Sequence, residues 1–402
     1  MKIKLGICVH SPDRTSLNFA LSIHSAKIRE NVHLLELPDS IAYPPFINSH
    51  DHLIGNWVPR AGENNPYPTT DIWVEEMKNS PSFQERNKVW FNDGTFELTH
   101  GNAPLLAKLG VYKNIFSGCA IVQDHGPNQK DEYYDMFPVN VIRDYRQCHS
   151  LSLGNWWGGG TAVEEWQKTE GRIPFILHLA EGTDEAAKAA FSKLEQLNLL
   201  QPNILIIHGI AMNEYAIARC AEIGASICCC PESNMFLIGK TIDIDSCLKK
   251  GVNLVLGTDS TMSGSTNLLT EIRQFKHYHP WINSSYILSM ITRNAVKALM
   301  LPVRLAEISN SAADLVITSR KHPDPFENLL YLEMEDIKLL LHDGTPIYGD
   351  RELLDVFEIN PDDYFFFQTE NSTKFVIGQP QKITARIDEI LGYHKQFPYL
   401  PF

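Results

Sequence analysis

The feature that most constrains the fold is a succession of apolar runs separated by segments with helical patterning. Between residues 46 and 300, about eight short apolar runs alternate with segments that have the spacing of amphipathic helices. The later runs are apolar at nearly every position, which is typical of parallel strands buried on both faces. About eight strand–helix units over roughly 255 residues match the size of a TIM barrel. We therefore predict an α/β fold with a (β/α)8 barrel. A doubly wound open sheet is the alternative, but no glycine-rich phosphate loop follows the first run.

The pattern changes on both sides of this region, which predicts a second, smaller domain. Residues 1–45 and 304–402 contain short runs typical of β-strands, with residues 342–345 as a hairpin turn. We expect a small β-sandwich domain formed from the two chain ends. The predicted boundaries give 1–45 as its N-terminal part, 46–303 as the barrel, and 304–402 as its C-terminal part plus a helix over 385–394.

Residues 53–105 form a long polar and aromatic segment directly after the first apolar run of the barrel. A structureless loop of this length is unusual, so we expect short helices over 71–78 and 82–89. The segment is either a wall of a site or an exposed decoration, and the sequence favours neither.

Composition excludes several classes of partner. The net charge of -13 argues against nucleic acid and against anionic lipid as binding partners. No stretch approaches the roughly 20 apolar residues of a membrane span, and the polar N-terminus does not resemble a signal peptide. The eight cysteines are scattered without a Cys-x-x-Cys pair, which is typical of reduced thiols. We expect a cytoplasmic protein that binds a small molecule.

Polar side chains follow several of the predicted barrel strands. His50 and His52, His178, His208 and Asp259 stand at the ends of four apolar runs. Strand ends meet at one rim of a barrel, so these side chains are expected to converge. Each of them alone could be an ordinary solvated strand-end residue. Together, three or more histidines and a carboxylate suit zinc or ferrous iron.

Glu181 follows His178 by three residues. A carboxylate just beyond a metal ligand can exchange protons with a reacting water without binding the metal itself. The alternative is an acidic residue that stabilises the start of the next helix.

The ordered motifs resemble the amidohydrolase superfamily. They are His50-x-His52, His178-x-x-Glu181, His208-Gly209, Pro231-x-Ser233-Asn234 and Gly257-Thr258-Asp259-Ser260. More narrowly, they are similar to the branch that contains cytosine, guanine and S-adenosylhomocysteine deaminases and triazine hydrolases. The similarity extends from about residue 46 to residue 300.

The resemblance implies a role for each matching residue. His50, His52, His178 and Asp259 would bind one divalent metal, zinc in the first place and iron as the alternative. Glu181 would be the acid/base, Asp259 would take a proton from the attacking water, and His208 would orient that water or polarise the substrate. Binuclear relatives carry a carboxylated lysine after the fourth strand, and residues 148–160 contain no lysine, so one metal is expected. Relatives also suggest a homodimer.

We therefore predict a hydrolase acting on carbon–nitrogen bonds other than peptide bonds. The expected reaction is hydrolytic deamination of an aminated purine, pyrimidine, pterin or triazine-like ring. A related hydrolase that cleaves a cyclic amide or a carbon–halogen bond is the alternative, and ammonia release separates the two. A non-catalytic scaffold ranks last, because such a protein should have lost its ligands.

Candidate substrate-binding residues come from the same region of the chain: Trp57, Arg60, His125, Trp156 and Asn234. Trp156 and its neighbour Trp157 precede three glycines and could stack on a planar ring, although for each of them packing at the barrel edge is slightly favoured. Arg60 could pair with a substrate anion or with a surface carboxylate. His125 could contact substrate or be structural.

Overall fold

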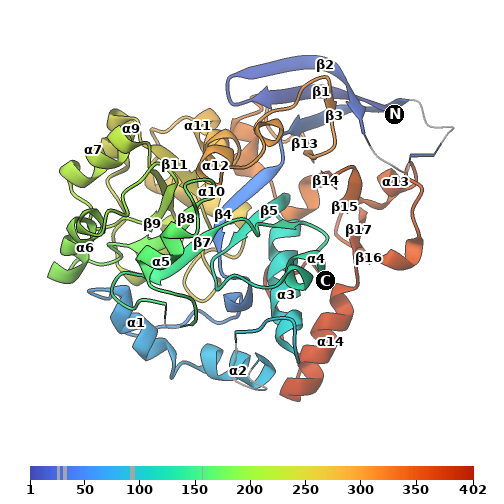
Figure 1. The fold of residues 1–402 in the computed structure, drawn as a ribbon. Helices are drawn as coiled ribbons and strands as arrows, with labels where there is room; N and C mark the ends of the chain where they lie inside the picture. The colour runs from blue at the N-terminus through green and yellow to red at the C-terminus, as the bar shows by residue number, and fades with distance from the viewer. Residues whose placement is uncertain (25–27, 30–33, 91–95, 156) are drawn as a thin grey trace.

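A computed structural model describes residues 1–24, 28–29, 34–90, 96–155 and 157–402 of the chain (Figure 1). The centre of the molecule is built from eight parallel strands among these residues, in the sheet orders β4-β5-β6 and β7-β8-β9-β10-β11. Their bounds are β4 (Phe46–Asp51), β5 (Cys119–Asp124), β6 (Asn140–Val141), β7 (Arg146–Ser150), β8 (Phe175–Leu179), β9 (Ile204–His208), β10 (Ser226–Cys229) and β11 (Asn253–Leu256).

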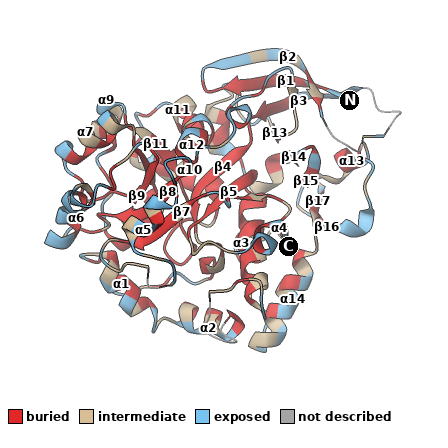
Figure 2. Ribbon diagram, viewed as in Figure 1, coloured by how far each residue is buried: buried red, intermediate tan, exposed pale blue. Residues whose placement is uncertain are grey.

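Spatial neighbours among these strands follow the order of the chain, as in a (β/α)8 barrel. The last and first strands meet where the backbone N–H groups of Thr258 and Asp259 donate to the carbonyl oxygen of His50, at 3.0 and 3.1 Å. Every residue of β4, β5, β8 and β9 is buried, so these strands are red along their length in Figure 2. Burial on both faces explains the continuous apolar runs, and the predicted barrel is confirmed.

The helices that alternate with the barrel strands cover its outside (Figure 1). They are α3 (Ala103–Ile115), α4 (Asp131–Asp135), α5 (Ala162–Gln167), α6 (Glu185–Gln196), α7 (Glu214–Ile223), α8 (Pro231–Leu237), α9 (Ile244–Lys250), α10 (Leu268–Tyr278), α11 (Ser284–Met290) and α12 (Arg293–Ala298). Side-chain caps begin several of them: Asp184 accepts from the N–H of Ala187, and Asn213 accepts from that of Ala216.

The segment after β4 contains the short helix η1 (Leu53–Gly55) and the helices α1 (Thr70–Met77) and α2 (Pro81–Trp90). Both helices expected from the sequence are therefore present. Helix α1 is tied to the barrel rim, because the N–H of Thr70 donates to the carbonyl oxygen of Glu181 at 3.1 Å. This contact holds the segment over one end of the barrel.

Strands from both chain ends share one nine-stranded sheet, of order β12-β2-β1-β3-β13-β14-β15-β17-β16. Their bounds are β1 (Lys2–Ser11), β2 (Arg14–Ile23), β3 (Leu34–Tyr43), β12 (Ser311–Ala312), β13 (Leu315–Ser319), β14 (Ile337–His342), β15 (Thr345–Asp350), β16 (Tyr364–Gln368) and β17 (Thr373–Ile377). The two ends meet where β3 pairs antiparallel with β13. This shared sheet is consistent with the small β domain expected from the termini.

Short helices complete the C-terminal region: η2 (Val303–Leu305), η3 (Glu327–Tyr331), η4 (Met334–Asp336), α13 (Arg351–Leu354) and η5 (Pro361–Asp363). The final helix, α14 (Pro380–Leu391), begins earlier than the expected 385–394 because Pro380 occupies its first turn. In the described part of the chain, no helix combines the length and apolar character needed to cross a membrane.

Candidate metal centre and active site

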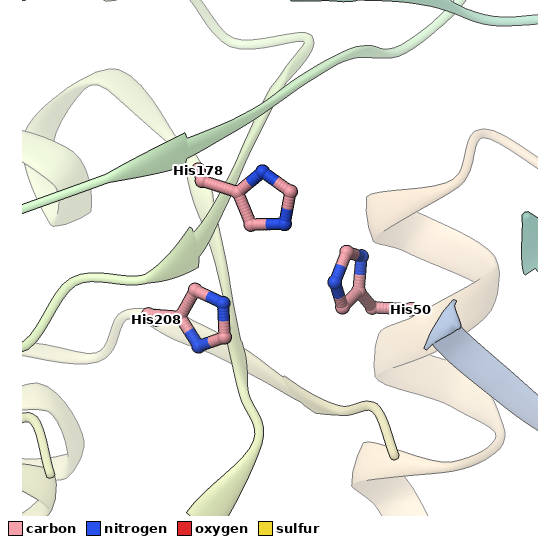
Figure 3. A group of neighbouring side chains, drawn as sticks. All are labelled: His50, His178 and His208. Atoms are coloured by element: carbon pink, nitrogen blue, oxygen red, sulfur yellow. The ribbon is translucent and has the colours of Figure 1, made fainter. Parts of the chain in front are cut away.

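Histidines from three different strands converge at the carboxyl ends of the barrel strands (Figure 3). One ligand atom from each of His50, His178 and His208 lies within 4.8 Å of the other two. A second group, formed by His50, His52 and Asp259, meets the same limit. His50 belongs to both groups, so the predicted ligands surround one small region although they are distant in sequence.

The donor set fits a divalent metal. The Nδ1 atom of His178 lies 2.8 Å from the carbonyl oxygen of His149. Because a carbonyl oxygen only accepts, Nδ1 carries the proton and Nε2 keeps its lone pair for a ligand. Both ring nitrogens of His50 are buried without a hydrogen-bond partner among the described residues. Unpaired buried nitrogens are costly unless a further group binds them, and a metal ion is such a group.

Protonation also favours this interpretation. Burial, followed by the neighbouring rings of His52 and His208, lowers the pKa of His50 far below its ordinary value. Burial and the adjacent imidazoles do the same to the pKa of His178. Both rings are therefore neutral near pH 7, which is the form that binds metal.

Asp259 is held as a carboxylate at the edge of this cluster. Burial alone would raise the pKa of Asp259, but His52, His208 and the Ser233 hydroxyl lower it more strongly, so the net shift is downward. Its Oδ1 lies 3.6 Å from Nε2 of His52, and its Oδ2 accepts from the Ser233 hydroxyl at 2.7 Å. Gly257 is required nearby because a Cβ atom there would lie 2.6 Å from the Cβ of His50.

Glu181 and His208 face each other beside the cluster. Oε1 of Glu181 lies 3.4 Å from Nε2 of His208. On the other side of the ring, Nδ1 of His208 lies 2.7 Å from Oδ1 of Asn234, which fixes the ring orientation. Burial and then the charge of Asp259 raise the pKa of Glu181 well above its ordinary value. A buried carboxyl that holds its proton near neutral pH is suited to donate that proton to a bound substrate.

A buried ion pair lies directly behind the histidines. Nζ of Lys113, on α3, lies 3.2 Å from Oδ1 of Asp51 and donates to Oδ1 of Asn56 and Oγ1 of Thr258, both at 2.9 Å. It also donates to the backbone carbonyl of Asp259 at 2.7 Å. Asp259 has a φ of +54°, an unfavourable value for a non-glycine residue, and this hydrogen bond helps to hold it.

A cavity of about 1030 Å³, its open mouth included, leads from the surface to these groups. Its floor contains His52, His178, His208, Glu181 and Asp259. Its wall comes largely from the segment after β4 and is mostly apolar: Thr70, Trp73, Val74, Met77, Phe83, Arg86, Trp90, Phe96 and Leu98. The described part of the segment 53–105 therefore supplies much of the cavity wall.

The structure separates the predicted substrate-binding residues. His125 lines the cavity and stacks on His178 with ring centroids 4.4 Å apart. Trp57 is fully buried, donates to Glu85 at 2.6 Å and packs on Phe397, away from the cavity lining. Trp156 lies outside the described residues.

Two other residues predicted to contact substrate, Arg60 and Asn234, are not among the residues that line this cavity. Arg60 donates to Glu232 at 2.6 Å and lies over the Phe236 ring, so its charge is satisfied outside the cavity lining. Asn234 is buried behind His208, and it orients that ring instead of lining the cavity.

The sequence interpretation missed four residues that matter here. Arg86 and Trp73 line the cavity from α2 and α1, and His149 lines it from the end of β7. Lys113 lies in the last turn of a largely apolar helix, α3. His149 had only a weak signal, because the sequence predicts a weak strand over about residues 148–153, which does not end at this histidine. Arg86 and Lys113 had none, because a basic residue on a helix is normally exposed.

Comparisons with known proteins agree with this geometry. A family model described as the amidohydrolase family matches residues 167–349. A protein from Pyrococcus abyssi named 5-methylthioadenosine/S-adenosylhomocysteine deaminase is 31% identical over 375 residues, which cover 81% of this chain and 86% of that protein. A protein of the same name from Syntrophobacter fumaroxidans is 27% identical over 206 residues, about half of each chain (46% and 47%).

Solved structures share the whole fold at low sequence identity. An adenosine deaminase from Xanthomonas campestris with bound zinc has a TM-score of 0.72 and 16% identity, with 97% of both chains covered. A zinc complex of an atrazine chlorohydrolase from Arthrobacter aurescens has a TM-score of 0.71 and 16% identity, covering 97% of this chain and 99% of that one. The extent of the match to the Pyrococcus abyssi protein carries the assignment: the chain belongs to the amidohydrolase family.

Proposed function

We propose that the protein is a metal-dependent hydrolase that removes the amino group of an aminated heterocycle. The observation that carries this proposal is a buried carboxyl, Glu181, beside a cluster of neutral histidines at the floor of an apolar cavity. Hydrolysis at a ring carbon needs a proton donor and a metal site that can both reach the substrate in the same cavity.

We propose His50, His52, His178 and Asp259 as ligands of one divalent metal. Zinc is the first candidate, because nitrogen-rich sites with a carboxylate suit it and two solved structures of the same fold contain it. When bound, such an ion would supply Lewis acidity that lowers the pKa of a water to about 7.

The protein's own groups move the protons. Asp259 is ionised, so it can accept a proton from the attacking water. Glu181 holds a proton near neutral pH and can donate it to a ring nitrogen, which makes the amine-bearing carbon more electrophilic. His208 is fixed by Asn234, which accepts from its Nδ1, so its Nε2 can accept a hydrogen bond from the attacking water and orient it. The proton that Asp259 accepted can then pass to the amino group, which leaves as ammonia, and the proton of the added hydroxyl can return to Glu181 as the carbonyl forms.

An adenine-type ring is the substrate that we propose first. The names of the Pyrococcus abyssi and Syntrophobacter fumaroxidans relatives specify adenosine derivatives, and the aromatic wall of this cavity suits a planar ring. Hydrolysis of a carbon–halogen bond stays the second candidate, because an atrazine chlorohydrolase has the same fold.

We also keep three predictions about context as proposals. They are a homodimer, a cytoplasmic location, and the division of the chain after residues 45 and 303. All eight cysteines are free and buried, which supports a reducing compartment.

The test combines metal analysis of the purified protein with a screen for ammonia release from amino-heterocycles. Glu181→Gln removes the proton donor while keeping the size of the side chain, so we expect kcat to fall by about 10²–10⁴ with the metal content unchanged. Glu185→Gln is the control, because the Glu185 side chain is 90% exposed at the start of α6, and it should leave kcat unchanged. Near-full turnover of metal-loaded Glu181→Gln would refute the role of Glu181.

A further inference from the structure

Arg86 is a buried cation in the wall of the active-site cavity. It lies in the middle of α2, its residue is only 6% exposed, and it lines the same cavity as Glu181 and Asp259. Among the described residues that line this cavity, Arg86 is the one with a permanent positive charge.

The guanidinium of Arg86 forms no ion pair with any described carboxylate. Its Nη2 donates to Oδ1 of Asn87 at 3.2 Å and its Nη1 lies 3.9 Å from the Met262 sulfur, which is a weak acceptor. Its Nε is buried with no acceptor among the described residues. Most of its donors therefore lack a strong partner.

The other buried cations of the described chain behave differently. Lys113 is paired with Asp51 at 3.2 Å, and Lys374 is paired with Asp350 at 2.6 Å. Two of the three buried cations among the described residues are thus paired with a carboxylate. The third, Arg86 at the cavity wall, has no carboxylate partner among them. An unpaired buried charge is expensive, so it indicates a partner that binds there.

Aromatic rings hold the guanidinium in a fixed position. Its carbon lies 4.6 Å from the centroid of the Phe83 ring and 5.1 Å from that of the Trp90 ring. Contacts with ring faces stabilise the cation but use none of its N–H donors. Burial lowers the pKa of Arg86 to about 10, so the group is still charged at neutral pH.

We propose that Arg86 binds an anionic group, a carboxylate or a phosphate, at the far end of a substituent on the substrate ring. The proposal rests on the proposed function and specifies its substrate class: an aminated heterocycle with an arm that ends in an anionic group. The arm itself is expected to be largely apolar, because Trp73, Val74 and Met77 line the same wall. A planar guanidinium with free donors matches the geometry of both anions.

The test uses probes that share one ring and differ at the end of the arm: an N-carboxybutyl adenine, its uncharged methyl ester, and the phosphonobutyl counterpart. A charge-assisted contact should favour the acid over the ester by about 10–100-fold in kcat/KM. Arg86→Met should bring this ratio close to one while changing kcat/KM for the ester less than about threefold, the size expected without a lost charge contact. Whichever anionic arm is preferred identifies the chemistry.

Lys88→Met is the matched control, because Lys88 is an exposed cation on the same helix, and it should keep the wild-type ratio. If Arg86→Met does not fold, Arg86→Lys serves instead, since it keeps the charge but loses the paired donors and should retain only part of the preference.

Binding to metal-depleted protein, followed as a shift in Tm, separates this inference from the proposed function. A larger shift with the acid than with the ester, lost in Arg86→Met, supports the anion site even if no probe releases ammonia. Equal shifts for acid and ester in the wild type, or a preference for the acid that survives in Arg86→Met, would overturn the inference while leaving deamination untouched.

Discussion

Lys113 and Asp51 form a buried ion pair next to the residues that we propose as metal ligands. Asp51 stands between His50 and His52 on the chain, and Lys113 joins it to the backbone carbonyl of Asp259. The pair thus contacts the segments that carry three of the proposed ligands. We infer that Lys113 is a positioning residue, which acts on the metal through the backbone of β4 and of the loop after β11.

Lys113→Met should therefore weaken both folding and metal binding. Removing one partner of a buried pair leaves the other charge uncompensated, which costs about 3–5 kcal/mol in the free energy of unfolding. Misplaced ligands should lower zinc affinity by about 10–100-fold. Denaturant unfolding and competition with a chelator measure the two effects separately.

Lys374→Met is the control, because Lys374 is equally buried and paired but lies in the sheet formed by the chain ends. It should lose comparable stability and keep the zinc affinity of the wild type. If the two variants had the same zinc affinity, Lys113 would have only a structural role.

At the scale of elements, the parts predictable from sequence were those with a repeating physical pattern. Buried parallel strands need continuous apolar runs, and the residue after each run reaches the rim, so His50, His178 and His208 could be placed together. Trp57 and Arg60 could not be placed, because the segment after β4 has no such repeat. Whether a Trp or Arg there faces the cavity or a neighbour such as Glu85 or Glu232 depends on tertiary packing.

Buried basic residues were the other feature that could not be predicted from the sequence. Lys113 and Arg86 occur on helices whose sequences contain nothing that marks a basic residue as buried. Their partners, Asp51 in one case and two aromatic rings in the other, come close only in the folded chain.

The segment after α14 packs against the cavity wall from outside. Phe397 is 4% exposed and packs on Trp57, while the hydroxyl of Tyr399 donates to the carbonyl oxygen of Asn56 at 2.6 Å. Lys395 pairs with Glu85 of α2, the neighbour of Arg86. Helix α2 therefore depends on residues that are distant in sequence, as its position near α14 in Figure 1 illustrates.

Phe397→Ala should loosen α2 in particular. Truncation of a buried Phe costs about 3–5 kcal/mol, and the loss falls on the contact with Trp57. Amide hydrogen exchange should speed up in α2 more than in α6, which lies at the left edge of Figure 1, away from α2 and α14, and serves as the internal control. Equal acceleration in both helices would mean that the contact contributes only to global stability.

At the scale of the whole molecule, strands from both chain ends form one sheet, and the middle of the chain forms the barrel. Val316 and Ile317 of β13 pair with Tyr43 and Ala42 of β3, so residues about 270 positions apart are neighbours. Contacts between such distant segments make stability a property of the whole chain, and one buried group can affect it measurably.

Glu271 provides a test of how far one buried group affects the stability of the whole chain. It is fully buried in α10, one oxygen accepts from the N–H of Glu232 at 3.2 Å, and the other has no partner among the described residues. Burial raises the pKa of Glu271 from 4.5 to about 8. A carboxyl whose pKa is higher in the folded state favours folding fully below its unfolded pKa, and this contribution is lost as pH rises through about 8.

Glu271→Gln removes that ionisation while keeping the shape of the side chain. The stability of the variant relative to the wild type should therefore rise between about pH 5 and pH 9, by a few kcal/mol at most, since each pKa unit corresponds to about 1.4 kcal/mol. Comparing the two proteins at each pH cancels the other titrating groups of an acidic chain. Glu185→Gln, at an exposed position, should show no such trend in Tm or in the denaturant midpoint. A constant difference between Glu271→Gln and the wild type across this range would show that Glu271 is already ionised, and would require a cation beside it.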